Sequence, residues 1–290
     1  LPDFDAVYTA IVDRVVGLSH TSPVVYAVPG SPLVGERAVD LLKTAAAEVG
    51  VAVRVMPSLS FLDLVYAAVE LDPITDGLQV VDARELPDPL PFHLPTIITQ
   101  VDTRLRAADV SVALGRTLDA DHRIVVLDRL GDPDEVIEES TVAGLALFDA
   151  GERTSVFVAP TSSGLLGLIA TNRTLRAECP WDRKQTHHSL VTHLIEEAYE
   201  TVDAIAGLPL DSPEGEPDFG AYAEVEEELG DLLLQVVFHA TLASETGAFD
   251  LDEVAEGIRR KLVFRHPHVF GDVEVSGANF HELGRLAAKL

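Results

Sequence analysis

Cysteine is almost absent from this sequence of 290 residues, which contains Cys179 alone. A single thiol excludes an intrachain disulfide, and it excludes a zinc or iron–sulfur centre built on cysteine. No uninterrupted apolar run approaches the roughly 18 residues that a membrane-spanning helix needs. We therefore expect a globular protein of a reducing, cytoplasmic compartment, with no membrane segment.

Positive charge is also scarce, since 21 Lys and Arg face 48 Asp and Glu, for a formal net charge of −27 at pH 7. A chain this acidic repels the phosphates of nucleic acid and of anionic lipid, so neither is expected as a partner. A phosphorylated substrate must then arrive with a cation or meet a local basic cluster. No Lys or Arg occurs from position 185 to 257, and a basic cluster then follows: Arg259, Arg260, Lys261 and Arg265.

The length suggests about two domains. The first half alternates between strand and helix patterns, which is typical of an α/β layer structure. Helices are expected at 36–49 and 59–71. Strands are expected at 24–28, 51–55, 78–81, 96–101, 123–127 and 155–158.

A Pro/Ser/Gly stretch at 159–164 is the best linker candidate, and the strand signal disappears after it. Helical periodicity then predicts helices at 165–177, 189–206, 222–244 and 251–264. The sequence therefore predicts a multi-domain chain, with an α/β domain over residues 1–160 and an all-α domain over residues 161–290.

Two of the predicted helices carry carboxylates beside their apolar stripes. Residues three or four apart share a helix face, so each set projects together. If the helices pack antiparallel through their stripes, the two sets face each other. The acids are Glu196, Glu197 and Glu200 on the first helix, and Glu228 and Asp231 on the second, with Glu224 one turn earlier.

Two interpretations of these acids stay open. Acid runs usually mark a solvated helix face, because glutamate is a good helix former. A metal site is favoured by the position of the acids beside the stripes and by the lack of lysine partners four residues away. Oxygen-only ligands suit Mg²⁺ or Mn²⁺ better than zinc.

The last predicted helix ends in positive charge. Lys261 and Arg265 share a face, and Pro267 should end the helix near Arg265. Cations at a helix C-terminus are favoured by the helix dipole alone. The functional alternative is a phosphate clamp with a forked Arg265 and a point charge on Lys261. His266 and His268 are expected to make structural hydrogen bonds rather than to bind a metal.

Two aromatic rings could line a bound nucleotide. Trp181 is the only tryptophan, and a lone tryptophan is more often core or interface, although an indole can stack on a base. His193 lies one turn before Glu197 and could reach a substrate edge. Cys179 has no pair of basic neighbours to activate it and is expected to be structural.

Four motifs follow one another in the second half. They are Cys-Pro-Trp-Asp-Arg-Lys-Gln-Thr-His at 179–187, Glu-Glu-x-x-Glu at 196–200, Glu-Leu-Gly-Asp at 228–231 with Phe-His-Ala at 238–240, and Lys-x-x-x-Arg-His-Pro-His-Val-Phe at 261–270. Together they closely resemble the MazG nucleoside triphosphate pyrophosphohydrolases, over roughly residues 165–275. The resemblance implies an all-α fold that dimerises through its helices and hydrolyses NTP to NMP and pyrophosphate with Mg²⁺.

The resemblance also implies residue roles. Glu197, Glu200, Glu228 and Asp231 would be the Mg²⁺ ligands. Lys261 and Arg265 would bind the triphosphate, while His193 and Glu224 would lie along the nucleotide. Glu196, the acid left over, is our candidate for orienting or deprotonating the attacking water. The segment 280–290 departs from the family, which usually has a tryptophan there that helps to hold the base.

The first half resembles the C-terminal part of a tetrapyrrole methylase domain over residues 4–160. The matching residues are Val-Tyr-Ala-Val-Pro-Gly-Ser-Pro-Leu-Val at 25–34, Glu36-Arg37, Ser-Leu-Ser-Phe-Leu-Asp at 58–63 and Gln100-Val101. The family's N-terminal Gly-rich loop, which approaches S-adenosylmethionine, is missing. The chain opens Leu-Pro without Met, so two alternatives stay open: the sequence begins partway through the natural chain, or the cofactor site is incomplete. S-adenosylmethionine is not expected to bind with this N-terminus.

Two other functions stay open at this point. The chain could be an S-adenosylmethionine-dependent methyltransferase with a helical appendage, or a non-catalytic nucleotide-binding or dimerisation module.

Overall fold

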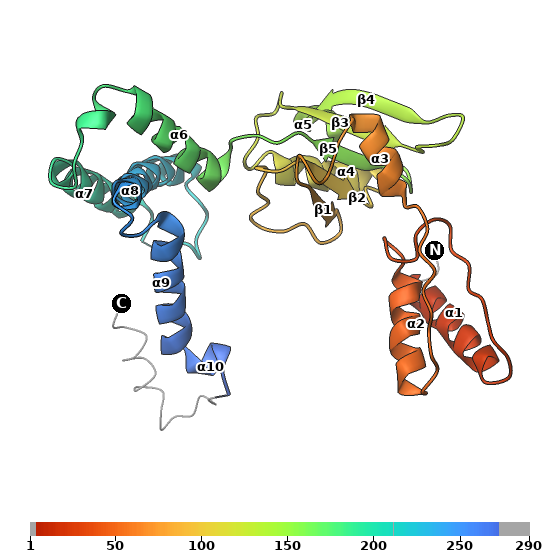
Figure 1. The fold of residues 1–290 in the computed structure, drawn as a ribbon. Coiled ribbons are helices and arrows are strands. Elements are labelled where there is room, and N and C mark those ends of the chain that lie inside the picture. Colours follow the sequence, from red (N-terminus) through yellow and green to blue (C-terminus); the bar gives the residue numbers. More distant parts are fainter. Residues whose placement is uncertain (1–3, 211, 273–290) are drawn as a thin grey trace. The chain divides into compact units, whose positions relative to one another are not determined.

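The structure, a computed structural model, describes residues 4–210 and 212–272 (Figure 1). The chain divides into two compact units, Leu1–Thr161 and Ser162–Leu290. The division lies in the Pro/Ser/Gly stretch at 159–164, the stretch whose composition predicts a linker.

A five-stranded mixed sheet forms the centre of the first unit, in the order β1-β2-β5-β3-β4. Strand β1 runs parallel to β2, whereas β2–β5, β5–β3 and β3–β4 are antiparallel pairs. The strands are β1 Gln79–Asp82, β2 Thr96–Thr99, β3 Arg123–Asp128, β4 Val136–Thr141 and β5 Ser155–Val158.

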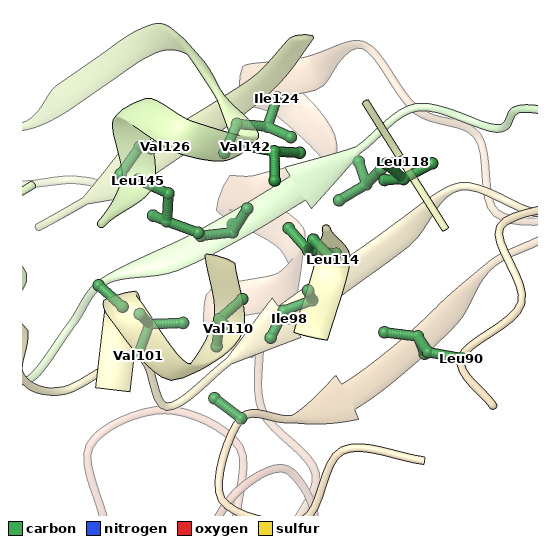
Figure 2. Close-up of a cluster of buried hydrophobic side chains, with 14 of the residues drawn as sticks. Leu90, Ile98, Val101, Val110, Leu114, Leu118, Ile124, Val126, Val142 and Leu145 are labelled. Atoms are coloured by element: carbon green, nitrogen blue, oxygen red, sulfur yellow. The ribbon is translucent and has the colours of Figure 1, made fainter. Parts of the chain in front are cut away.

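Helices cover both faces of this sheet. On one face, α4 and α5 pack on a large apolar cluster that includes Ile98, Val110 and Val126 (Figure 2). On the other face, Val65 of α3 packs against Ile97 of β2 and Leu127 of β3. The helices of this unit are α1 Phe4–Ser19, α2 Arg37–Glu48, α3 Phe61–Val69, α4 Arg104–Leu114 and α5 Val142–Leu145.

Local sequence explains where these helices begin. Ser60 and Asp63 form a capping box at the start of α3, and the Thr103 hydroxyl accepts a hydrogen bond from the Arg106 amide at the start of α4. Such caps satisfy amide groups that have no partner within the helix. The five-stranded sheet with helices on both faces confirms the α/β class predicted for this unit.

Two predicted strands of the first half are wrong. Segments 24–28 and 51–55 have no regular secondary structure, and no strand in the described part of the chain pairs with either. Val25 is 92% exposed, so its β-branched side chain has no sheet to pack on. A strand is stabilised by its neighbours, and alternating apolar residues report only a local preference.

The second unit is helical throughout its described residues. All four predicted helices are present, and the largest shift of an end is at α8, which begins at Phe219 rather than Tyr222. The elements are α6 Gly164–Glu178, η1 Asp182–Lys184, α7 Val191–Gly207, α8 Phe219–Glu245, α9 Leu251–Arg265 and α10 Pro267–Phe270. Helices α6 and α7 both pack against α8. None of the described helices combines the length and the apolar character that crossing a membrane requires.

Candidate metal and nucleotide site

Three carboxylates meet where α7 packs on α8. One oxygen from each of Glu197, Glu200 and Glu228 lies within 4.8 Å of the others. Glu197 and Glu228 are partly buried, whereas Glu200 is exposed. Antiparallel contact through the apolar stripes predicts such a meeting, and the structure brings these three predicted residues together.

A buried hydroxyl fixes the two helices at this level. Thr201 is only 5% exposed. Its Oγ1 lies 2.7 Å from the Glu197 carbonyl oxygen on α7 and 3.2 Å from the Glu228 carbonyl oxygen on α8. This contact holds the backbones that carry Glu197 and Glu228 side by side. Sequence reasoning missed Thr201, although a small hydroxyl residue next to Glu200 in an apolar stripe was a usable signal.

Asp231 lies near this cluster without belonging to its tightest group. Its charge raises the pKa of Glu197 and also that of Glu228. Its side chain is exposed, one helical turn after Glu228 on α8. Asp231 is therefore close enough to act by its charge on two members of the cluster, Glu197 and Glu228.

The cluster is electrostatically uncompensated. The pKa of Glu197 is raised above 4.5 by burial first, and then by the charges of Asp231, Glu200, Glu196 and Glu228. The pKa of Glu228 is also raised, by burial first and then by the charges of Glu200, Asp231 and Glu227. No cationic side chain among the described residues offsets either shift. Like charges held this close favour proton uptake or cation binding.

A row of side chains leads along α7 to the cluster. Trp181, which is 53% exposed, lies edge-on to His193 with ring centroids 5.9 Å apart. His193 Nδ1 lies 3.7 Å from a carboxylate oxygen of Glu196. Glu196 is exposed and adjoins Glu197. Glu224, also exposed, lies one turn before Glu228 on α8. Trp181, His193 and Glu196 thus follow one another in contact, and Glu224 lies on the helix that carries Glu228.

The basic cluster on α9 divides into two pairs. Arg259 Nε and Arg260 Nε lie 2.6 and 2.7 Å from carboxylate oxygens of Glu256. The two arginines lower the pKa of Glu256 to about 2. Lys261 has no ion pair among the described residues, and Arg265 Nη1 is buried without a hydrogen-bond partner there. Within this cluster on α9, Lys261 and Arg265 are therefore the cations without an acidic partner among the described residues.

The structure does not bring Lys261 or Arg265 into the carboxylate cluster. Helix α9 follows α8 through a short turn and contacts it (Figure 1). His266 Nδ1 lies 2.7 Å from the Leu262 carbonyl oxygen, a structural contact of the expected kind, whereas His268 Nδ1 has no partner in the described part of the chain. The segment 280–290 lies outside the described residues.

The helical unit is similar to known proteins. Residues 185–270 match the family described as the MazG nucleotide pyrophosphohydrolase domain. The nucleoside triphosphate pyrophosphohydrolase/pyrophosphatase MazG of Thermotoga maritima is 52% identical over 94 residues, 32% of this chain and 32% of that protein. The uncharacterized protein YabN of Bacillus subtilis is 38% identical over 286 residues, 95% of this chain and 56% of YabN.

The chain thus spans about half the length of YabN and about a third of the Thermotoga protein. Among solved structures, uroporphyrin III C-methyltransferase from Thermus thermophilus aligns with a TM-score of 0.42 at 17% identity, over 52% of this chain and 70% of that one. The resemblance to methyltransferases of this type lies in the N-terminal half.

Proposed function

We propose, from the MazG domain at residues 185–270, that this chain hydrolyses nucleoside triphosphates to the monophosphate and pyrophosphate with Mg²⁺. The observation that carries the proposal is the meeting of Glu197, Glu200 and Glu228 within 4.8 Å of one another. These residues lie on two helices of the matched segment, so the cluster and the family similarity coincide.

The residues fit a hard divalent cation. All the candidate ligands are carboxylate oxygens, which Mg²⁺ and Mn²⁺ prefer over the nitrogen and sulfur ligands typical of zinc. The raised pKa values of Glu197 and Glu228 show that the folded chain penalises their charges. A bound cation would remove that penalty. Asp231 completes the set of four ligands that we propose.

The chemistry needs an attack by water on the α-phosphorus. A Mg²⁺ ion bound by the four acids would neutralise charge on the triphosphate and polarise the attacking water. Glu196 is exposed next to Glu197 and is left over from metal binding, so we assign it the role of orienting the water and accepting its proton. The bond from the α-phosphorus to the bridging oxygen breaks, and pyrophosphate leaves.

Lys261 and Arg265 would bind the phosphate tail. Both lack an acidic partner in the described residues, unlike Arg259 and Arg260 beside them. A guanidinium can bind two phosphate oxygens at once, and an ammonium adds a point charge. They would stabilise the leaving pyrophosphate electrostatically. Trp181, His193 and Glu224 would lie along the nucleoside, with the Trp181 ring available for stacking on the base.

A second copy of this chain would cover apolar surface on α9. This helix buries none of its residues. Val254, Ile258 and Leu262, four residues apart and so on one face, are 39%, 42% and 36% exposed. A continuous apolar stripe of this kind marks a protein–protein contact. We therefore propose a homodimer through the helical unit.

The broader setting follows from the same chemistry. The net charge of −27 disfavours nucleic acid and anionic membranes as partners. We propose a cytoplasmic, house-cleaning enzyme that acts on canonical or damaged NTPs.

The test is pyrophosphate release from a panel of canonical and modified NTPs, measured with a coupled pyrophosphatase in the presence and absence of Mg²⁺. Glu200→Ala and Asp231→Ala should each abolish Mg²⁺-dependent release. Glu226→Ala is the matched control, because Glu226 is an exposed acid on α8 outside the cluster. Full Mg²⁺-dependent release by either of the first two variants would overturn the assignment.

A further inference from the structure

A pair of histidines lies outside the carboxylate cluster and has no part in the proposed chemistry. His187 precedes α7, and His239 lies in the second half of α8. Their Nδ1 atoms are 2.8 Å apart. The ring centroids are 5.1 Å apart, and the ring planes differ by 10°.

These lengths describe an end-to-end contact rather than a stack. The centroid separation exceeds the nitrogen separation by about two ring radii, so both nitrogens lie close to the line that joins the ring centres. With the rings nearly coplanar, each Nδ1 points its in-plane orbital at the other. This is a linear hydrogen bond, which requires one proton between the two nitrogens. Two protons there would make two donors that face each other.

The two rings have different surroundings. His187 is exposed, whereas His239 is partly buried and its Nε2 is buried without a partner in the described residues. The pKa of His239 is lowered from 6.5 by burial first and by His187 second. If His187 carries a proton on both nitrogens, its Nδ1–H still donates to His239. A second proton removes the acceptor and breaks the contact.

The helices that contact one another in this region carry other charged groups. Those on the elements packed nearby are Arg173, Arg176 and Glu178 on α6, Asp182, Arg183 and Lys184 in η1, His188 next to His187, His193 and Glu196 on α7, and Glu245 on α8. Arg176 and Glu245 bind each other at 2.7 Å. Only His187 acts by its charge on the pKa of His239.

The pair holds the middle of the segment that carries Trp181. Gln185, two residues before His187, donates from Nε2 to the Trp181 carbonyl oxygen at 3.0 Å. Ser189, two residues after, donates to Gln185 Oε1 at 2.8 Å. These hydrogen bonds join the residues on both sides of His187 to the Trp181 backbone. Leu190, buried against Phe238 and Leu242, anchors the end of the segment.

We infer that His187 and His239 share one proton and act as a latch, which positions the Trp181 segment on α8 for nucleotide binding and opens when acid supplies a second proton. The two are positioning residues, since neither touches the proposed substrate. The role in nucleotide binding rests on the proposed function, whereas the latch itself does not.

The sign of the effect follows from the lowered pKa of His239. A group whose pKa is depressed in the folded state contributes stability above its unfolded value, here 6.5, and that stability is lost as pH falls through the folded value. The latch is closed at neutral pH and opens on acidification below the ordinary histidine range.

The direct test is nitrogen NMR on the full chain labelled with ¹⁵N-histidine, without metal or nucleotide. The latch predicts a single proton coupled to the Nδ1 atoms of both rings near neutral pH, and the loss of this signal in acid. Independent titration of the two rings, with no shared proton at any pH, would overturn the proposal. This result would leave the proposed hydrolysis untouched.

A second test uses Trp181, the only tryptophan, as a fluorescent reporter. His193 is replaced by Gln in every chain, because a charged imidazole edge-on to the indole would itself alter the emission. The emission of this chain should change on acidification. The change should be absent when His187→Phe and His239→Phe are added, and should persist with His188→Phe, the control. Persistence in the double phenylalanine chain would contradict the latch.

The kinetic signature is a pH-dependent KM. With the natural His193, KM for NTP should rise more steeply in acid than in the chain that carries His187→Phe and His239→Phe, while kcat follows the same pH profile in both. Identical KM profiles would refute the positioning role.

Discussion

Removal of one charge from the carboxylate cluster should stabilise the metal-free helical unit. Glu200→Gln keeps the shape of the side chain and removes a charge within 4.8 Å of the Glu197 carboxylate. At this distance, Coulomb repulsion between two unit charges is about 1 kcal/mol at the dielectric constant of water. Since Glu200 is exposed, we take that value rather than the larger one for a protein interior. For a unit of this size, the melting temperature should rise by roughly 4 °C.

The assay is thermal unfolding with a chelator present, followed by the emission of Trp181, which lies in the helical unit. The wild-type chain should then gain stability from Mg²⁺, because the ion binds only the folded cluster. Glu200→Gln should gain little. Glu200→Gln should therefore melt above the wild type in chelator and below it in Mg²⁺. In chelator, high salt should reduce the difference in melting temperature, because salt screens the repulsion between the carboxylates.

Glu226→Gln serves as the control, since it also removes one negative charge, but from an exposed residue of α8 outside the cluster. The reasoning is refuted if Glu200→Gln melts lower than the wild type in chelator, or if Mg²⁺ stabilises both chains equally.

Three further predictions concern neighbouring groups. Burial and like charge raise the pKa values of Glu197 and Glu228, so the metal-free unit should gain stability from these groups as pH falls toward 4.5. Urea unfolding of the chain that lacks the histidine pair measures this gain, and a flat profile would argue against it. Thr201→Val should lower the unfolding free energy by about 1 kcal/mol, measured by denaturant unfolding, because the buried hydroxyl loses its contacts. It should also weaken Mg²⁺ binding, measured by calorimetry. Unchanged Mg²⁺ affinity would show that the hydroxyl does not align the cluster. Arg265→Ala should raise KM for NTP at least tenfold in steady-state assays. Arg259→Ala should leave KM unchanged, because this variant loses only the ion pair with Glu256. Equal effects of the two substitutions would contradict the division of the basic cluster.

The helical unit could be predicted from sequence because its signals are local and repeated. Apolar residues at helical spacing predict α6 to α9, with the largest shift at the start of α8. The acids beside the apolar stripes lie where α7 and α8 meet. The pairing of the cations in the basic cluster was not predicted from the sequence. The division of α9 by Glu256 follows from spacings of three and four residues, so it could have been found from the sequence.

The features that sequence reasoning missed depend on contacts between distant segments. The His187–His239 contact joins positions 52 residues apart, and no periodicity reports it. Thr201 contacts Glu228 across 27 residues. The prediction of strands at 24–28 and 51–55 was wrong for the opposite reason. The residues there favour strands locally, but no partner strand pairs with them in the described chain.

The most direct measurement of the central claim is the fate of labelled water. NTP is incubated in ¹⁸O-water with and without Mg²⁺, using the wild-type chain and Glu228→Gln, and the products are analysed by mass spectrometry. The account predicts ¹⁸O in the nucleoside monophosphate, unlabelled pyrophosphate, and turnover only by the wild-type chain with Mg²⁺. Label in pyrophosphate or inorganic phosphate, or equal turnover by Glu228→Gln, would contradict it.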